Sequence, residues 1–358
     1  MTSGVPLPAT DPLFHRRGRK RRCVHVSLLL SLAGSGFTAF AFAAEGAAER
    51  SAGAVLAFAV GPSVIYAGTA TGGLYRSADG GASWTLVEGP LAGLSVSAVV
   101  LEPDGSSGAF AGTNGAGAFR QGGSAADWTE SNSGLANLFV EALAIDRGPP
   151  KALYAGTDGG VFRSLDGAQT WKPISEGIPE QLVTALAVSP AGVVFAGTKR
   201  SGVFRLDRGG EKWSAASVGL PRATVRAFAV APGEPPTVYV ATEAGLFKTA
   251  NAGETWIPVN SGLSSTSILA LAVDPSSVSR LHACTVTGLF RTGNSGTNWT
   301  AVPTGPGGAF LGAIAAGPGP SDLLAGADGA VLKSGDGGKS WRSVKLPPPP
   351  PREEEEEE

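Results

Sequence analysis

The chain is poor in the residues that build catalytic and metal centres. Among its 358 residues there are two cysteines, one methionine and three histidines, and only His282 lies outside the first 43 residues. A single histidine leaves no Ser-His-Asp or Cys-His catalytic arrangement, and no cluster has the spacing of zinc ligands. We therefore expect no catalytic residue, no metal and no cofactor.

Charge is scarce as well. Charged residues make up 16% of the chain, and acids and bases nearly balance once the two terminal segments are set aside. A near-neutral body offers no basic surface to nucleic acid, so we expect no nucleic-acid partner.

One long apolar run lies near the N-terminus. Six basic residues between Arg16 and Arg22 precede an apolar stretch over residues 23–44, and Ala41-Phe42-Ala43 forms a small-x-small cleavage pattern. This order predicts a secretory signal peptide over residues 1–43, and hence a secreted or periplasmic protein. An uncleaved anchor helix is the alternative, and it would be the only membrane contact.

Removal of the leader leaves one cysteine, which excludes an internal disulfide. That residue, Cys284, occupies a repeat position held by glycine in other repeats, namely Gly68, Gly112, Gly156 and Gly197. We expect a packed small residue there and not a reactive thiol.

What the chain does have is a repeat. Its seven tryptophans follow one another at intervals of 42 to 44 residues: Trp84, Trp128, Trp171, Trp213, Trp256, Trp299 and Trp341. Five of them end a Ser/Thr-x-Asp/Asn turn, whose acidic or amide residues are Asp79, Asp166, Asn251, Asn294 and Asp336. The copies before Trp128 and Trp213 have decayed. A short Asx side chain bonds the backbone that follows it, and glycine supplies the backbone angles that such a turn needs.

Each repeat also predicts four short strands. In the first copy they are Leu56 to Val60, Val64 to Thr69, Gly73 to Ser77, and a fourth beginning at Trp84. Four strands in about 43 residues is the period of a propeller blade. We predict an all-β fold, a seven-bladed β-propeller of four-stranded antiparallel blades over residues 53–346, in which blade 7 packs on blade 1 without a shared blade.

The remaining segments flank this ring. Residues 44–52 are expected to be a short linker, and residues 347–358 a Pro-rich spacer with an acidic, solvated and disordered tail.

The repeated turn resembles the Asp-box, or BNR, repeat of sialidase-like propellers, of sortilin-type receptors and of photosystem II assembly and stability factors. The resemblance implies that the boxes are structural turns between the third and fourth strands. The single propeller and the export signal look most like the photosystem II factor type, which implies a protein-binding assembly role.

A glycan-binding or sialidase-like glycoside hydrolase propeller is the alternative. The Phe/Tyr-Arg-Ile-Pro signature that starts the arginine triad of sialidases is absent. Tyr66, Tyr154 and Tyr239 share one repeat position, and Tyr75 replaces the phenylalanine of other repeats, so all four are interpreted as core residues. We therefore expect a non-enzymatic protein.

Each repeat carries a cation eight residues before its tryptophan: Arg76, Arg120, Arg163, Arg205, Lys248, Arg291 and Lys333. We interpret these side chains as structural, with the stem lying on the neighbouring blade and the head bonding the backbone near the turn. An anion-binding rim is the alternative.

Positions that break the repeat are better functional candidates. At the start of the first strand the equivalent residues are Leu56, Ser97, Glu141, Thr184, Arg226, Leu269 and Gly312, of which only Glu141 and Arg226 are charged. Turns between second and third strands share that face and add Asp158, Lys199, Arg200 and Glu243, and Arg222 lies nearby in the chain. Our hypothesis is that this face, opposite the Asx turns, lets a monomer bind a protein partner, with a glycan as the alternative ligand.

Overall fold

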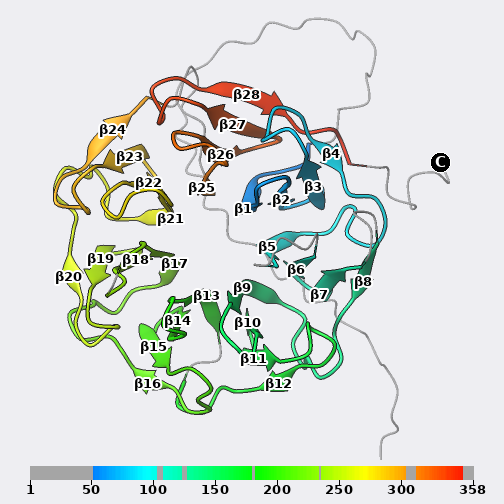
Figure 1. Cartoon of the computed structure of the whole chain (residues 1–358), viewed down its shortest axis with the longest axis vertical. Helices are drawn as coiled ribbons and strands as arrows, with labels where there is room; N and C mark the ends of the chain where they lie inside the picture. Colours follow the sequence, from blue (N-terminus) through cyan, green and yellow to red (C-terminus); the bar gives the residue numbers. More distant parts are fainter. Residues whose placement is uncertain are drawn as a thin grey trace, which may run out of the picture. The chain divides into compact units, whose positions relative to one another are not determined.

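A computed structural model describes residues 51–102, 108–122, 127–179, 182–233, 235–303 and 312–349. The predicted signal peptide, linker residues 44–50 and tail residues 350–358 lie outside these ranges. Within them the chain is all-β, with no helix, and its strands form seven antiparallel four-stranded sheets (Figure 1). The predicted seven-bladed β-propeller is confirmed.

The strands of each blade follow one another from the central channel outward in chain order. The bounds are as follows: blade 1, β1 (Val55–Val60), β2 (Ile65–Thr69), β3 (Leu74–Ser77), β4 (Thr85–Leu86); blade 2, β5 (Val96–Leu101), β6 (Ala109–Thr113), β7 (Gly117–Gln121), β8 (Trp128–Glu130); blade 3, β9 (Val140–Asp146), β10 (Ala152–Thr157), β11 (Gly160–Ser164), β12 (Lys172–Pro173); blade 4, β13 (Val183–Val188), β14 (Val194–Thr198), β15 (Val203–Leu206), β16 (Ser214–Ala215); blade 5, β17 (Val225–Val230), β18 (Val238–Thr242), β19 (Gly245–Thr249), β20 (Ile257–Pro258); blade 6, β21 (Ile268–Val273), β22 (Leu281–Thr285), β23 (Gly288–Thr292), β24 (Thr300–Val302); blade 7, β25 (Ile314–Ala316), β26 (Leu323–Ala327), β27 (Ala330–Ser334), β28 (Arg342–Lys345).

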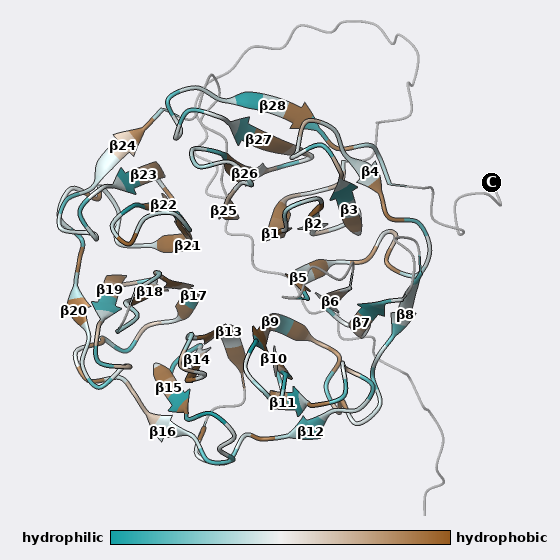
Figure 2. Ribbon diagram, viewed as in Figure 1, coloured by the Kyte–Doolittle hydropathy of each residue, from teal (hydrophilic) through white to brown (hydrophobic). Residues whose placement is uncertain are grey.

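The core lies between the blades. Second strands such as β2 are buried along their whole length, whereas fourth strands such as β4 and β12 are largely exposed. Seven apolar clusters fill the ring, one for each pair of neighbouring blades. Figure 2 shows the same division, with apolar colour on inner strands such as β17 and β21 and polar colour on the outer strand β12. Burial of this apolar surface is the main stabilising term of such a ring.

Four of the tryptophans, Trp171, Trp213, Trp256 and Trp299, bond their blade to the one before it. The indole Nε1 of Trp171, Trp256 and Trp299 donates to a backbone carbonyl 40 residues earlier, at 2.7, 2.8 and 2.8 Å. Their backbone nitrogens also donate to the preceding blade, as Trp171 does to the carbonyl of Ser133. We predicted fourth strands beginning at tryptophan, but all except β8 begin one residue later. Where its nitrogen bonds the preceding blade, the tryptophan cannot pair in its own sheet.

Ring closure occurs between whole blades, as predicted. Strands β1 to β4 and β25 to β28 form separate sheets, and an apolar cluster that includes Val55, Trp84 and Leu324 fills the interface. Chain segments outside the strands also bond across this interface between blades 7 and 1. A single β-bridge pairs Ala54 with Asp328, and the nitrogen of Gly329 donates to the carbonyl of Gly53 at 3.0 Å.

Candidate functional site at the channel mouth

A β-bulge opens the inner strand of six blades. The pairing register slips by one residue between, for example, Val225 and Ala227, which leaves the intervening residue unpaired. The bulged residues are Leu56, Ser97, Glu141, Thr184, Arg226 and Leu269. A bulge re-aims one side chain out of the strand pattern. All six line the central channel, a cavity of about 250 Å³, together with Gly312 of blade 7.

Hydroxyl side chains at the bulge bond the next blade. Ser97 donates to the carbonyl of Val140, and Thr184 donates to the carbonyl of Val225 at 2.6 Å. Glu141 and Arg226 occupy the same position in blades 3 and 5 with charged side chains. The two charged residues that break the repeat therefore project from equivalent bulges on β9 and β17.

The turns between second and third strands are fixed to the same rim. The nitrogen of Asp158 donates to the carbonyl of Phe139 at 3.2 Å, that of Lys199 to Leu182 at 3.3 Å, and that of Glu243 to Thr224 at 3.1 Å. Because each acceptor lies immediately before an inner strand, these bonds hold the turn beside the channel mouth. We call this surface the mouth face: the bulged residues, the turns that contain Asp158, Lys199 and Glu243, and the residues just before the inner strands.

Glu141, Asp158 and Lys199 interact on the mouth face. Burial raises the pKa of the Glu141 carboxyl, the negative charge of Asp158 raises it further, and the positive charge of Lys199 lowers it. Desolvation and a nearby like charge both disfavour a carboxylate. The structure thus brings together three of the predicted residues, from blades 3 and 4.

Arg226 forms an ion pair with Glu243 of its own blade. The pKa of Glu243 is lowered, first by a hydrogen bond from the Thr224 side chain and then by Arg226 and Lys199. Lys199 therefore acts on acids of both blades 3 and 5. Arg200 and Arg222 are exposed. Arg222 makes no ion pair within the described ranges, whereas the charge of Arg226 is offset by Glu243.

Sequence reasoning missed an apolar part of the mouth face. Phe139 and Leu138 lie immediately before β9 and are 46% and 38% exposed, and Leu56 is 37% exposed at its bulge. The residues equivalent to Phe139 in other blades are Ala54, Ser95, Leu182, Thr224 and Ser267, which bond the same turn position. An aromatic residue where other repeats have none was the available signal.

The five intact Asx turns have one geometry. In the first, the Ser77 hydroxyl donates to Asp79 Oδ1 at 2.8 Å and accepts from the nitrogen of Gly81 at 2.8 Å, and Asp79 Oδ1 accepts from the nitrogen of Ser83 at 2.9 Å. The turns around Asp166, Asn251, Asn294 and Asp336 repeat these bonds. Two consecutive residues with positive φ follow the Asx residue, as in Gly80 and Gly81.

These turns lie on the face opposite the mouth, because third-to-fourth and first-to-second connections share one end of an antiparallel blade. The carboxylates of Asp79, Asp166 and Asp336 are consumed by their own turns, and these hydrogen bonds lower their pKa values. The structural interpretation of the repeated cation is confirmed in blades 3 to 5. There Arg163, Arg205 and Lys248 donate to the carbonyls of Gly210, Ala252 and Ser295 in the next blade's turn, at 2.9, 3.1 and 3.0 Å.

Other candidates for chemistry are buried or dispersed. The thiol of Cys284 is fully buried, which raises its pKa to about 12. No group of three or more potential metal ligands gathers in the part of the chain that the structure describes. Nor does any helix long and apolar enough to cross a bilayer occur among those residues.

No protein-family model and no curated protein sequence matches the chain. Solved structures do match its fold. A GH74 enzyme from Niastella koreensis superposes with a TM-score of 0.69 and 17% identity, over 83% of this chain and 54% of the enzyme. YCF48 from Cyanidioschyzon merolae superposes with a TM-score of 0.60 and 18% identity, over 80% of this chain and 96% of YCF48. YCF48 bound to D1 peptide gives a TM-score of 0.60 and 14% identity, over 79% and 93%.

The chain thus spans about half the length of the GH74 enzyme and nearly all of YCF48. At these identities the likeness is one of fold. The molecule is a seven-bladed β-propeller whose structural neighbours include both glycoside hydrolases and YCF48.

Proposed function

We propose that this protein is an exported, non-enzymatic propeller that binds a partner protein over its mouth face, as a scaffold or assembly factor. Its five Asx turns are Asp-boxes in this proposal, and residues 1–43 direct export. The observation that carries the proposal is the combination of exposed Phe139 and Leu138 with a charged cluster at one rim. Exposed aromatic and apolar residues beside charges are typical of protein-binding surfaces.

The partner's chemistry follows from the rim. Leu138 and Phe139 provide an apolar contact on blade 3, and Lys199, Arg200 and Arg222 provide positive charge on the two blades that follow. A partner segment with an apolar side chain followed by an acidic group fits this order. One YCF48 neighbour is bound to a peptide, which supports a peptide-binding reading of this propeller shape.

The burial of the aromatic residues favours a protein over a glycan. Six of the seven tryptophans and all four tyrosines are buried, and Trp341 is half-buried. A sugar-binding site ordinarily presents an exposed indole or phenol ring as a platform. The exposed aromatic ring of the mouth face is a phenylalanine, Phe139.

The test is affinity capture from the membrane and extracytoplasmic fractions of the source organism, followed by binding of the purified partner. A Phe139→Ala/Arg222→Ala variant should lose the partner. A Lys172→Ala/Glu254→Ala variant, which changes exposed residues at the outer strand and the Asx-turn face, should keep it.

If both variants capture the partner equally well, the mouth face is not the binding surface. Saturable binding or hydrolysis of a polysaccharide that is lost in the Phe139→Ala/Arg222→Ala variant would replace the protein partner by a glycan.

A further inference from the structure

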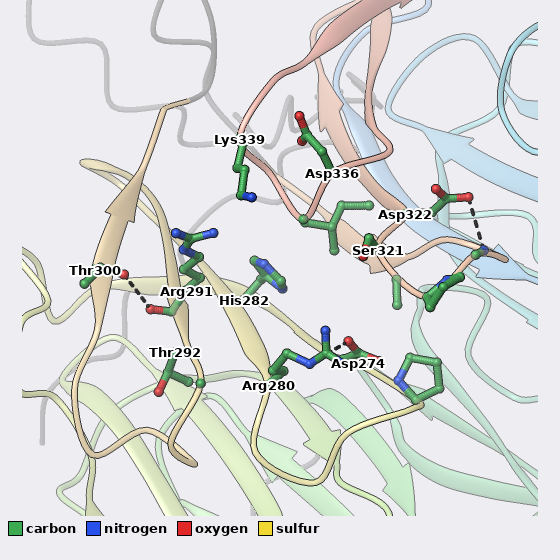
Figure 3. A pocket seen from close by; sticks show the side chains of 17 residues that line it. Asp274, Arg280, His282, Arg291, Thr292, Thr300, Ser321, Asp322, Asp336 and Lys339 are labelled. Atoms are coloured by element: carbon green, nitrogen blue, oxygen red, sulfur yellow. Dashed lines mark hydrogen bonds and ion pairs between the residues drawn. The ribbon is translucent and has the colours of Figure 1, made fainter.

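A second cavity lies between blades 6 and 7 on the Asx-turn face, away from the mouth face. Its volume is about 370 Å³, and its walls come from the β21–β22 loop, β22, β23, the β25–β26 loop and the Asx turn of blade 7. Figure 3 shows His282, Arg291 and Lys339 grouped on one side of it, with the guanidinium of Arg291 and the ammonium of Lys339 turned toward the cavity.

Arg291 lacks the hydrogen bond that the equivalent cation makes in blades 3 to 5. In blades 3 to 5 the equivalent cation donates to a backbone carbonyl in the turn of the next blade. In the turns of blades 5 and 6 the accepting residue, Ala252 or Ser295, directly follows the Asx residue. The counterpart in blade 7 is Gly337. Its backbone interacts instead with the ring of His282, which stands where other blades have Tyr66, Tyr154 or Tyr239. In the described part of the chain Arg291 makes no such bond to the turn of blade 7.

The acids of the cavity are already engaged. Asp274 pairs with Arg280 at 3.2 Å, and Asp322 accepts from the nitrogen of Gly319 at 3.1 Å. Asp336 accepts hydrogen bonds from Ser334 and Ser340 within its own turn. Neither the guanidinium of Arg291 nor the ammonium of Lys339 has an acid or carbonyl partner in the described part of the chain.

His282 lines the same wall, and one nitrogen of its ring is buried without a partner in the part of the chain that the structure describes. The residue is 8% exposed, and its Nδ1 is buried without a hydrogen-bond partner among the described residues. Burial and then the charge of Arg291 lower its pKa to about 4, so the ring is neutral at pH 7. A neutral imidazole has one donor and one acceptor nitrogen.

We infer that this cavity is a binding site for a phosphate-like oxyanion, held by Arg291 and Lys339 and contacted by His282. An arginine fork binds two oxygens of a tetrahedral anion, and lysine supplies a point charge. This site is independent of the proposed partner-binding function, because it lies on the opposite face.

Calorimetric titration of the full-length chain with inorganic phosphate, at constant ionic strength, tests the inference. We expect saturable binding at a single site, weakened about tenfold or more by Arg291→Gln, because a charge-assisted hydrogen bond is lost. Lys339→Gln should weaken it as well. Lys172→Gln, which removes an exposed lysine on β12, should leave it within about twofold, since distant surface charges are screened.

The histidine provides a readout that a purely structural role would not move. The charged groups around its ring are Arg291 on β23, Asp274 and Arg280 from the loop before β22, and Lys339 and Asp336 in the blade 7 turn. A bound anion should raise the pKa of His282, measured by NMR of the ring nitrogens, and Arg291→Gln should abolish this response to phosphate.

The source of the anion is separated by comparing inorganic phosphate with phosphoserine. Tighter binding of phosphoserine identifies a phosphoryl group carried by a larger molecule, and tighter binding of inorganic phosphate identifies the free ion. The inference is overturned if no saturable phosphate binding occurs, or if Arg291→Gln and Lys339→Gln bind as the unmodified chain does.

Discussion

The phenolic hydroxyl of Tyr75 donates a hydrogen bond of 2.8 Å to the carbonyl of Pro347, which lies 272 residues later in the chain. Tyr75 belongs to the third strand of blade 1 and is fully buried. Blades 2 to 6 carry phenylalanine here, as at Phe119 and Phe247, so the phenolic hydroxyl is what tyrosine adds in blade 1. It joins the first blade to the segment that leaves the last one.

Replacing Tyr75 with phenylalanine should therefore destabilise the ring closure without disturbing the packing. We expect a loss of about 1 kcal/mol in the free energy of unfolding, the net value of one hydrogen bond. Urea denaturation measures it. In a chain that ends at Leu346 the carbonyl of Pro347 is absent, so the same substitution should cause no further loss in the free energy of unfolding. If the losses from truncation and substitution add up, Tyr75 and Pro347 are not coupled.

The Asx turns predict a pH dependence of stability. Hydrogen bonds hold the folded-state pKa of Asp166 at about 2 and lower those of Asp79 and Asp336. Since the folded pKa lies below the unfolded value near 3.8, these groups stabilise the fold fully above that value, and the contribution is lost as the pH falls toward 2.

Substituting asparagine for all three aspartates should flatten this dependence, because blades 5 and 6 already use Asn251 and Asn294 in the same turns. Midpoints of urea unfolding between pH 5 and pH 2 provide the measurement. An unchanged slope would show that other carboxylates dominate acid unfolding.

The mouth face makes a third prediction. Burial and Asp158 raise the pKa of Glu141, whereas Lys199 lowers it. Asp158→Asn should therefore move the pKa of Glu141 down, and Lys199→Gln should move it up, as followed by carbon NMR of the side-chain carboxyl. Because the folded-state pKa is raised, stability falls as the pH rises from the unfolded value through the folded one, and Glu141→Gln should stabilise the chain at neutral pH. Shifts of the same sign in both variants would contradict this arrangement.

Cys284 should be inert while the protein is folded. Its thiol is fully buried with a pKa of about 12, and alkylation requires an exposed thiolate. In a Cys23→Ala chain, iodoacetamide should label Cys284 only as fast as the fold opens, and immediately in denaturant. Rapid labelling under native conditions would show that the interface between blades 6 and 7 opens locally.

The sequence predicts the fold well because every blade states the same pattern. Tryptophan spacing gives the number of blades, and the alternation of short apolar segments with turns gives their four strands. Recurrence also separates structural residues from candidates, which is how Glu141 and Arg226 stand out and how the role of Arg163, Arg205 and Lys248 is predicted.

Features that depend on the register between strands, or on contacts between residues distant in the chain, could not be predicted. The extra residue in each inner strand is visible only once the register with the second strand is known, so the bulge that displays Glu141 is absent from the pattern. The repeat places His282 at the position of Tyr66, Tyr154 and Tyr239, but only the structure shows that its ring interacts with the backbone of Gly337. The hydrogen bond between Tyr75 and Pro347 joins residues from opposite ends of the chain, and local sequence propensity gives no information about such a contact.

The closure of the ring between complete blades has an evolutionary consequence. A propeller that splits one blade between its two ends must preserve that division whenever repeats are gained or lost. Here every blade is one continuous segment. Contacts between the last blade and the first are made by short stretches such as Ser51 to Ala54 and Leu346 to Pro347. Duplication or deletion of a single repeat would leave every sheet whole, and the new ring would need only to fit its first blade against its last.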